Sequence, residues 1–152
     1  MRTFQLNVVV GATCFALAIL AAKPATACGG NGETAATWQP LSVAQLSAGL
    51  SQKQPFAIYD VNSDKTRQVY GMIPGARALS STQYQPTEEL PPNKDALLVF
   101  YCANTRCTAS HQAADRAIDA GYHHVFVLTE GIAGWLNAGQ QVATPVGQTK
   151  NI

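Results

Sequence analysis

The stretch from Leu97 to Gly121 constrains the fold of this chain more than any other part of its sequence. It opens with an apolar run, Leu97–Tyr101, rich in the branched and aromatic residues that favour a buried strand. Small and apolar residues then recur at helical spacing up to the helix-stopping Gly121: Ala109, Ala113, Ala114, Ala117 and Ile118. Because Cys102 stands where the apolar run stops, the sequence predicts a strand, a cysteine-bearing loop and a helix.

The position of Cys102 between a strand and the start of a helix indicates a reactive thiol. Backbone N–H groups converge there, and the helix dipole favours a negative charge. Both conditions lower the pKa of a thiol, and the thiolate is the reactive form. We therefore predict that Cys102 is a nucleophile, and the alternative is a buried structural thiol.

Residues 1–27 have the pattern of a signal peptide. Arg2 gives a weakly basic start, Val8–Ala22 is almost entirely apolar, and Ala25-Thr26-Ala27 fits a cleavage site. We expect cleavage after Ala27 and a periplasmic or secreted protein that begins at Cys28. The alternatives are an uncleaved membrane anchor, for which the apolar run is short, and a lipid-anchored Cys28, for which the usual Leu is replaced by Ala25.

The remaining chain has the size of one domain, which we place at residues 38–146, after a flexible lead-in at 28–37 and before a tail at 147–152. The formal net charge of the whole chain is +1, and its charges are scattered. This gives no reason to expect nucleic acid or, after cleavage, a membrane surface as a partner, and we expect a monomer. Three cysteines follow Ala27, so in an oxidising compartment at least one is free, modified or paired with another molecule.

Further elements are predicted on both sides of the central stretch. In chain order they are a helix capped by Ser42 and Gln45, a strand at Phe56–Val61, a helix from Ser63 to Tyr70, a strand at Ala78-Leu79, an irregular connection from Ser80 to Asp95, a strand at Val125–Leu128 and a helix around Trp135. Alternating strands and helices predict an α/β domain with a central, mostly parallel sheet flanked by helices. Ligands bind beyond the carboxyl ends of such strands, where Asp60 and Cys102 both lie.

Four spaced motifs and a Gly-Tyr pair resemble those of rhodanese-like domains, in the same order along the chain. They are YDVN at Tyr59–Asn62, YGMIPGA at Tyr70–Ala76, VFYC at Val99–Cys102, GY at Gly121-Tyr122 and EGIAGW at Glu130–Trp135. The resemblance covers nearly the whole chain after Ala27. It implies a small α/β domain with a central parallel sheet, and sulfur transfer through a cysteine persulfide.

The resemblance also implies roles for particular residues. Cys102 matches the nucleophile, Asp60 matches an aspartate that supports the active-site loop by hydrogen bonding, and Arg67 lies near an arginine linked to that aspartate. Arg106 would be the only cation in the loop. The backbone N–H groups that would cradle the substrate belong to the segment Ala103–Thr108, with Ala103, Asn104, Thr105 and Thr108 as substrate contacts. No cofactor or metal is implied.

The loop departs from the common form of the family. Thr105 stands where glycine is usual, so a left-handed backbone there would be strained. The loop is also somewhat longer, and it holds a second cysteine, Cys107. That residue could close a disulfide with Cys102, accept the sulfane sulfur from it, or fill space on the first helical turn.

Two other chemistries are disfavoured. His111 follows Cys107 at helical spacing, but the chain after Ala27 offers too few further ligands for a zinc site. A phosphatase of the related dual-specificity type would need an arginine six residues after the cysteine, where this chain has Thr108.

The leading prediction is an exported sulfurtransferase. Its Cys102 thiolate would take sulfur from a small anionic, thiosulfate-like donor and pass it to a thiol or another thiophilic acceptor. One alternative is a thiol–disulfide oxidoreductase that uses Cys102 and Cys107. The other is a non-catalytic rhodanese-like module that senses or docks.

Overall fold

The computed structural model describes residues 37–79 and 81–144. The predicted signal peptide, Cys28 and the C-terminal tail lie outside these residues, as does nearly all of the predicted lead-in. Among the helices of the described residues, none is long and apolar enough to cross a membrane.

Five parallel strands form one sheet with the order β1-β5-β4-β2-β3. The strands are β1 (Gln39–Leu41), β2 (Phe56–Asp60), β3 (Arg77–Ala78), β4 (Leu97–Tyr101) and β5 (His124–Leu128). The helices are α1 (Val43–Ser51), α2 (Asp64–Tyr70), α3 (Pro86–Glu89), α4 (Ala109–Asp119) and α5 (Gly131–Asn137). The prediction of an α/β domain with a parallel central sheet is confirmed, and β4, the strand directly before Cys102, is its middle strand.

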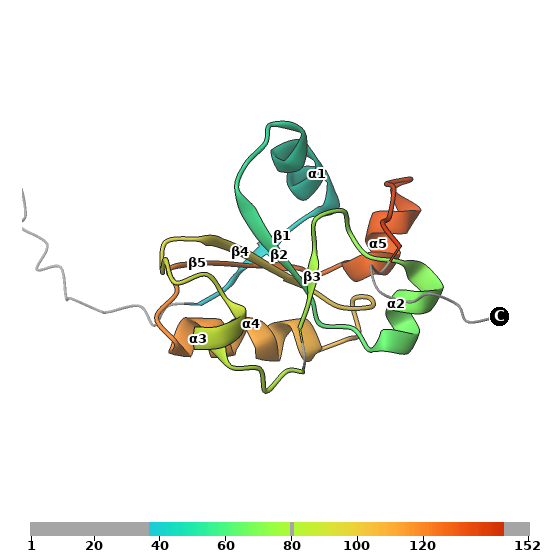
Figure 1. Ribbon diagram of the computed structural model, residues 1–152. Helices are drawn as coiled ribbons and strands as arrows, with labels where there is room; N and C mark the ends of the chain where they lie inside the picture. Colours follow the sequence, from blue (N-terminus) through green and yellow to red (C-terminus); the bar gives the residue numbers. More distant parts are fainter. Residues whose placement is uncertain (1–36, 80, 145–152) are drawn as a thin grey trace, which may run out of the picture. The chain divides into compact units, whose positions relative to one another are not determined.

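Helices cover both faces of the sheet, with α1 and α5 on one side and α3 and α4 on the other (Figure 1). The apolar core is divided accordingly. Leu98 and Phe100 of β4 pack with the alanines of α4, whereas Val99 and Tyr101 pack with residues of α1 and α5. Because side chains alternate along a strand, Cys102 continues the series that points toward α4.

The starts of two helices follow the capping signals in the sequence. Ser42 and Gln45 form a reciprocal capping box at α1, in which the Gln45 amide donates to Ser42 Oγ at 3.3 Å and the Ser42 amide donates to Gln45 Oε1 at 2.9 Å. Ser63 caps α2 by accepting a hydrogen bond from the Thr66 amide.

Three elements differ from the sequence prediction. Strand β1 was not predicted, because it is only three residues long and contains Pro40; it exists by pairing with β5 at the edge of the sheet, where proline is tolerated. The connection from Ser80 to Asp95 was predicted to be irregular throughout, but it contains the single-turn helix α3, which Pro86 begins. The predicted strand at Ala78-Leu79 lies one residue earlier, at Arg77–Ala78.

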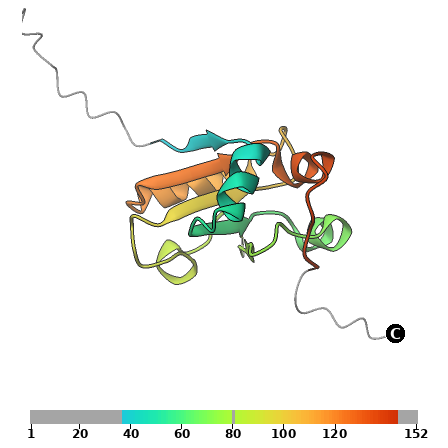
Figure 2. The same ribbon diagram turned by 90° about the horizontal axis from the view of Figure 1, so that it is seen from above.

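The parallel strands all end on the same side of the domain, and α2 and α5 lie at these carboxyl ends (Figure 2). Asp60 ends β2 and pairs in register with Tyr101, the last residue of β4. The topology therefore brings Asp60 and Cys102 to the same edge, as the sequence predicted, and this edge holds the candidate site.

Candidate active site

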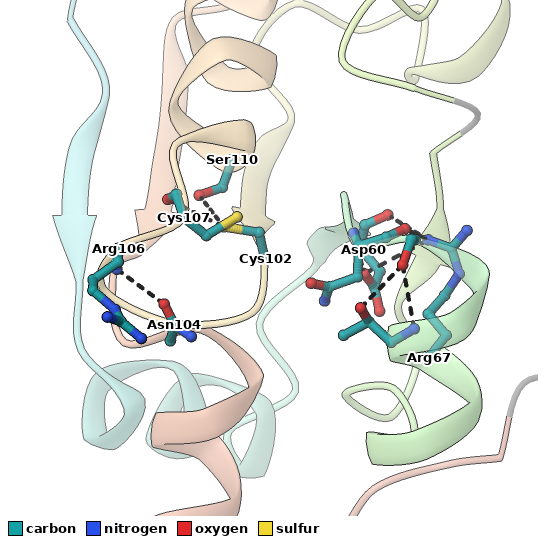
Figure 3. Close-up of a disulfide and its surroundings, with 10 residues drawn as sticks. Asp60, Arg67, Cys102, Asn104, Arg106, Cys107 and Ser110 are labelled. Atoms are coloured by element: carbon teal, nitrogen blue, oxygen red, sulfur yellow. Dashed lines mark hydrogen bonds and ion pairs between the residues drawn. A yellow bond between two sulfur atoms is a disulfide. The ribbon is translucent and has the colours of Figure 1, made fainter.

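The centre of the site is the cysteine loop, residues 102–108, between β4 and α4. Cys102 is 2% exposed, whereas Cys107 is partly exposed. The structure joins the two residues by a disulfide, with their Cα atoms 6.3 Å apart (Figure 3), within the range that a disulfide spans. This geometry agrees with the disulfide and sulfur-acceptor roles predicted for Cys107, because Cys107 lies within reach of the Cys102 sulfur. It also lies two residues before α4 rather than on its first turn.

Ser110 is the side chain from α4 that approaches the Cys102 sulfur. Its Oγ lies 3.3 Å from Cys102 Sγ, and the residue is 2% exposed. A buried hydroxyl at this distance can donate to the sulfur, and such a hydrogen bond favours the thiolate. The sequence analysis assigns Ser110 no role; the signal that could have indicated one is a polar residue on a buried helix face otherwise made of alanine.

Asn104 shapes the loop from within. Its carbonyl oxygen accepts the Cys107 amide at 3.0 Å, and its side-chain Oδ1 accepts the Arg106 amide at 3.0 Å. Two of the N–H groups predicted to cradle a substrate are therefore already bonded inside the loop. In the disulfide form, the amides of Arg106 and Cys107 are therefore not free to bind a substrate.

Thr105 does not adopt the left-handed backbone that would be strained at a threonine. Among the described residues, Lys53 is the only non-glycine residue with a positive φ. The longer loop turns through Asn104–Cys107 instead, so it does not need the left-handed conformation for which the shorter family loops use glycine. Thr105 and Thr108 are both exposed.

Arg106 lies on the outer side of the loop. Its side chain is exposed, and it points away from the two sulfur atoms (Figure 3). Within the described part of the chain, its guanidinium makes no hydrogen bond or ion pair. In this state it can act on an approaching anion, but it does not contact Cys102.

The start of α5 supports the cysteine loop from the opposite side. The amides of Ile132 and Ala133 donate to the carbonyl oxygens of Cys102 and Ala103 at 2.9 and 3.0 Å. Gly131 makes this approach possible: its φ is +61°, and an added Cβ would lie 2.5 Å from the Cys102 carbonyl oxygen. In the sequence, Gly131 is notable only as part of the EGIAGW motif. The structure shows that it allows the start of α5 to approach the loop backbone.

Asp60 belongs to a buried polar cluster beside the loop. It is fully buried, accepts the Tyr101 hydroxyl at 2.7 Å and the Asn62 amide at 2.7 Å, and lies 3.7 Å from Arg67 Nη1. Arg67 also donates to the carbonyl oxygens of Asp60 and Asn62 and to Asp64 Oδ1. The resemblance implied that Asp60 supports the loop by hydrogen bonding, and among the described residues its carboxylate accepts the hydroxyl of Tyr101, the residue before Cys102. Asp60 therefore contacts the end of β4, from which the cysteine loop starts.

Tyr101 links this cluster to the turn before β3. Its hydroxyl accepts the Ile73 amide at 3.1 Å while it donates to Asp60. Burial raises the pKa of Tyr101 well above its usual range, and the negative charge of Asp60 adds to the shift. The hydroxyl therefore keeps its proton and remains the donor that fixes Asp60.

Two cavities adjoin the cysteine loop. One, of about 270 Å³, lies between α2 and α5 and is lined by Thr66, Tyr70, Ala103, Asn104, Ile132, Ala133, Leu136 and Asn137. The other, of about 520 Å³, is more open and is lined by Asn104, Thr105, Glu130, Ala133, Gly134, Asn137 and Ala138. Both give a small molecule access to the loop at Asn104.

The histidine nearest the loop in sequence, His111, has a packing role. Its ring stacks on Trp38 with the centroids 4.7 Å apart. Among the residues that the structure describes, no three His, Cys, Asp or Glu side chains gather in a way that could hold a metal ion.

A five-stranded parallel sheet, with a cysteine loop between its middle strand and a helix N-terminus, defines a rhodanese-type α/β domain. The model of the Rhodanese-like domain family matches residues 42–138, and the chain belongs to this family. The predicted resemblance is thereby confirmed. A comparison with curated proteins found no match.

Solved structures share this fold. A protein from Bacillus halodurans has a TM-score of 0.61 and 18% identity, over 73% of this chain and 80% of its own. The rhodanese-like domain of an Anabaena sp. protein has a TM-score of 0.56 and 25% identity, over 74% of this chain and 89% of its own. A thiosulfate sulfurtransferase from Pseudomonas aeruginosa has a TM-score of 0.61 and 25% identity over 74% of this chain, but only 21% of that longer protein is covered.

Proposed function

We propose that this protein is a sulfurtransferase that carries sulfur as a persulfide on Cys102. The observation that carries the proposal is the position of Cys102: it directly follows the middle strand, it is buried, and the Ser110 hydroxyl lies 3.3 Å from its sulfur. A thiolate there has a hydrogen-bond donor and a helix start beside it, and both favour its negative charge.

The proposed reaction begins with the reduced loop. The Cys102 thiolate attacks the outer sulfur of thiosulfate, a bond forms between the two sulfur atoms, and the S–S bond of thiosulfate breaks. Sulfite leaves with the electron pair of that bond, and Cys102 keeps the outer sulfur as a persulfide. A thiol or another thiophilic acceptor then removes this sulfur and restores the thiolate.

Support for an anionic sulfur donor comes from two sources. Arg106 is an exposed cation on the loop with no partner among the described residues, so it is free to attract an anion. One structural neighbour, at 25% identity, is described as a thiosulfate sulfurtransferase. We propose the same donor class here.

A second candidate function is thiol–disulfide exchange, which the Cys102–Cys107 disulfide favours. In that function the two thiols would reduce an external disulfide and close their own. Thiosulfate would then be no substrate. A non-catalytic domain would carry out neither sulfur transfer nor thiol–disulfide exchange.

The variant Cys107→Ser tests sulfur transfer without interference from the disulfide. We expect the reduced variant, treated with thiosulfate, to release one equivalent of sulfite and to gain the mass of one sulfur atom on the peptide that contains Cys102. Cys102→Ser should do neither, because a serine hydroxyl is a weak nucleophile without a base. Cys28→Ser is the matched control and should behave like the wild type.

The outcomes separate the candidates. Sulfur uptake by Cys102→Ser but not by Cys107→Ser would contradict the assignment of the nucleophile. If no variant releases sulfite, and the wild-type dithiol reduces oxidised glutathione, exchange is the function. If neither reaction occurs, the domain is not catalytic.

A further inference from the structure

The two cysteines of the loop differ in their surroundings. Cys102 is 2% exposed, lies at the end of β4 and has Ser110 beside its sulfur. Cys107 is partly exposed and lies in the turn that Asn104 closes. Their sulfur atoms nevertheless come together, with the Cα atoms 6.3 Å apart (Figure 3). The Cys102 sulfur is therefore shielded from solvent, whereas a molecule from solution can reach the Cys107 sulfur.

We propose that Cys107 resolves the persulfide on Cys102 within the same chain and releases hydrogen sulfide. This inference rests on the proposed function, because it begins with the persulfide. The Cys107 thiolate attacks Sγ of Cys102, and a disulfide forms between the two residues. The bond from Sγ to the outer sulfur breaks, and that sulfur leaves with the electron pair as hydrosulfide, which takes up a proton. The outer sulfur gains two electrons, and the dithiol loses two.

The structure favours attack on Sγ over attack on the outer sulfur. Closing the disulfide is the geometry that the loop already adopts, with the Asn104 turn holding Cys107 toward Cys102. Hydrosulfide is the conjugate base of a stronger acid than an ordinary alkyl thiol, so attack on Sγ has a good leaving group. The protein would then be a thiosulfate reductase that consumes thiol equivalents, in addition to a sulfur carrier.

The cycle needs a thiol reductant, and the exposure of the two sulfur atoms decides where it attacks. A thiol can reach the partly exposed Cys107, whereas Cys102 is shielded by the loop and by α4. Attack on the Cys107 sulfur leaves a mixed disulfide at Cys107 and expels the Cys102 thiolate, which the Ser110 hydroxyl can stabilise. A second thiol then frees Cys107. The nucleophile is thus regenerated first.

The first test is a single turnover of the reduced wild-type protein with thiosulfate and no other thiol. We expect one equivalent each of sulfite and hydrogen sulfide, and a protein that has lost two hydrogens. Cys107→Ser should release sulfite alone and keep the added sulfur. Cys28→Ser, which removes a cysteine outside the described residues, should match the wild type.

These readouts distinguish failure of the inference from failure of the proposed function. If the wild type releases sulfite but keeps the added sulfur on Cys102 or passes it to Cys107, internal resolution is wrong and sulfur transfer stands. If no sulfite appears with any variant, the proposed function is wrong.

The second test maps the attack of the reductant, and it does not depend on thiosulfate. The disulfide form is treated briefly with reduced glutathione, and free thiols are then blocked with N-ethylmaleimide. Trypsin cleaves after Arg106 and so separates the two cysteines, onto the peptides 95–106 and 107–116. We expect glutathione on the Cys107 peptide and maleimide on the Cys102 peptide. The reverse pattern, or glutathione equally on both, would overturn the proposed order.

Discussion

At the scale of single residues, the chemistry depends on what surrounds each sulfur atom. Ser110 places a hydroxyl 3.3 Å from Cys102 Sγ, and both side chains are buried. Because little water reaches this contact, Ser110 can act as the hydrogen-bond donor to a Cys102 thiolate or to its persulfide. The hydroxyl that contacts the Cys102 sulfur therefore comes from α4 rather than from the loop.

The variant Ser110→Ala tests this contact in a Cys107→Ser background, where Cys102 cannot form the disulfide. Loss of a hydrogen bond to a charged group costs roughly 1.5 kcal/mol, about one pH unit in a titration. We expect the pH midpoint for alkylation of Cys102 by iodoacetamide to rise by about that amount, because the thiolate loses its donor. Ser51→Ala, at an exposed serine of α1, is the control. An unchanged midpoint would mean that Ser110 only fills space.

At the scale of elements, the site depends on how closely α5 approaches the cysteine loop. The first amides of α5 donate to the carbonyl oxygens of Cys102 and Ala103, so the loop backbone is held from the side opposite α4. Only a residue without a side chain fits between them, since a Cβ on Gly131 would lie within 3 Å of three backbone atoms of the loop. Strand β4, α4 and α5 together fix the position of Cys102.

The variant Gly131→Ala should lower the free energy of unfolding by roughly 2–4 kcal/mol, from an unfavourable positive φ and from the clash with the loop. Gly139→Ala is a matched control, because Gly139 also has a positive φ, +70°, but an added Cβ would meet nothing within 4 Å. It should cost only about 1–2 kcal/mol. Urea unfolding of both variants measures the difference. Equal losses would show that the approach of α5 is not tight.

At the scale of the whole molecule, buried tyrosines tie the layers together. Tyr59, Tyr84 and Tyr101 are each at most 1% exposed, and they lie on both faces of the sheet. Tyr84 donates to the Ala113 carbonyl oxygen of α4, and Tyr101 donates to Asp60. Burial raises the pKa of all three above the ordinary value of 10.0.

These raised pKa values predict alkaline unfolding. Above pH 10 the unfolded chain loses tyrosine protons that the folded protein keeps. The contribution of these tyrosines to the free energy of unfolding is therefore constant below that pH and falls above it. Three such groups give a slope of up to about 4 kcal/mol per pH unit. Urea unfolding between pH 9 and 11 measures the slope, which Tyr84→Phe should reduce by about a third. Tyr70→Phe, at a half-exposed tyrosine, is the control, and a flat profile up to pH 11 would contradict this account.

The sequence by itself determined the order of most elements and the position of Cys102 between a strand and a helix. The apolar run Leu97–Tyr101 and the alanines of α4 carry the periods of a strand and a helix, and Ser42 and Ser63 carry their capping signals. These are local properties: side-chain periodicity and hydrogen bonds within a few residues decide them. Asp60 and Cys102 could be placed at one edge because parallel strands end there.

Only the tertiary structure decided what contacts the sulfur atoms. Strand β1 exists because β5 pairs with it, and Ser110, Gly131 and Tyr101 acquire their roles from the packing of α4, α5 and β2 around β4. The disulfide depends on how Asn104 turns the loop, and the same turn directs Arg106 outward. Such contacts join residues whose separation is set by the docking of whole elements. A local sequence pattern cannot determine the distance between two such residues, because that distance depends on how all the side chains of the core pack together.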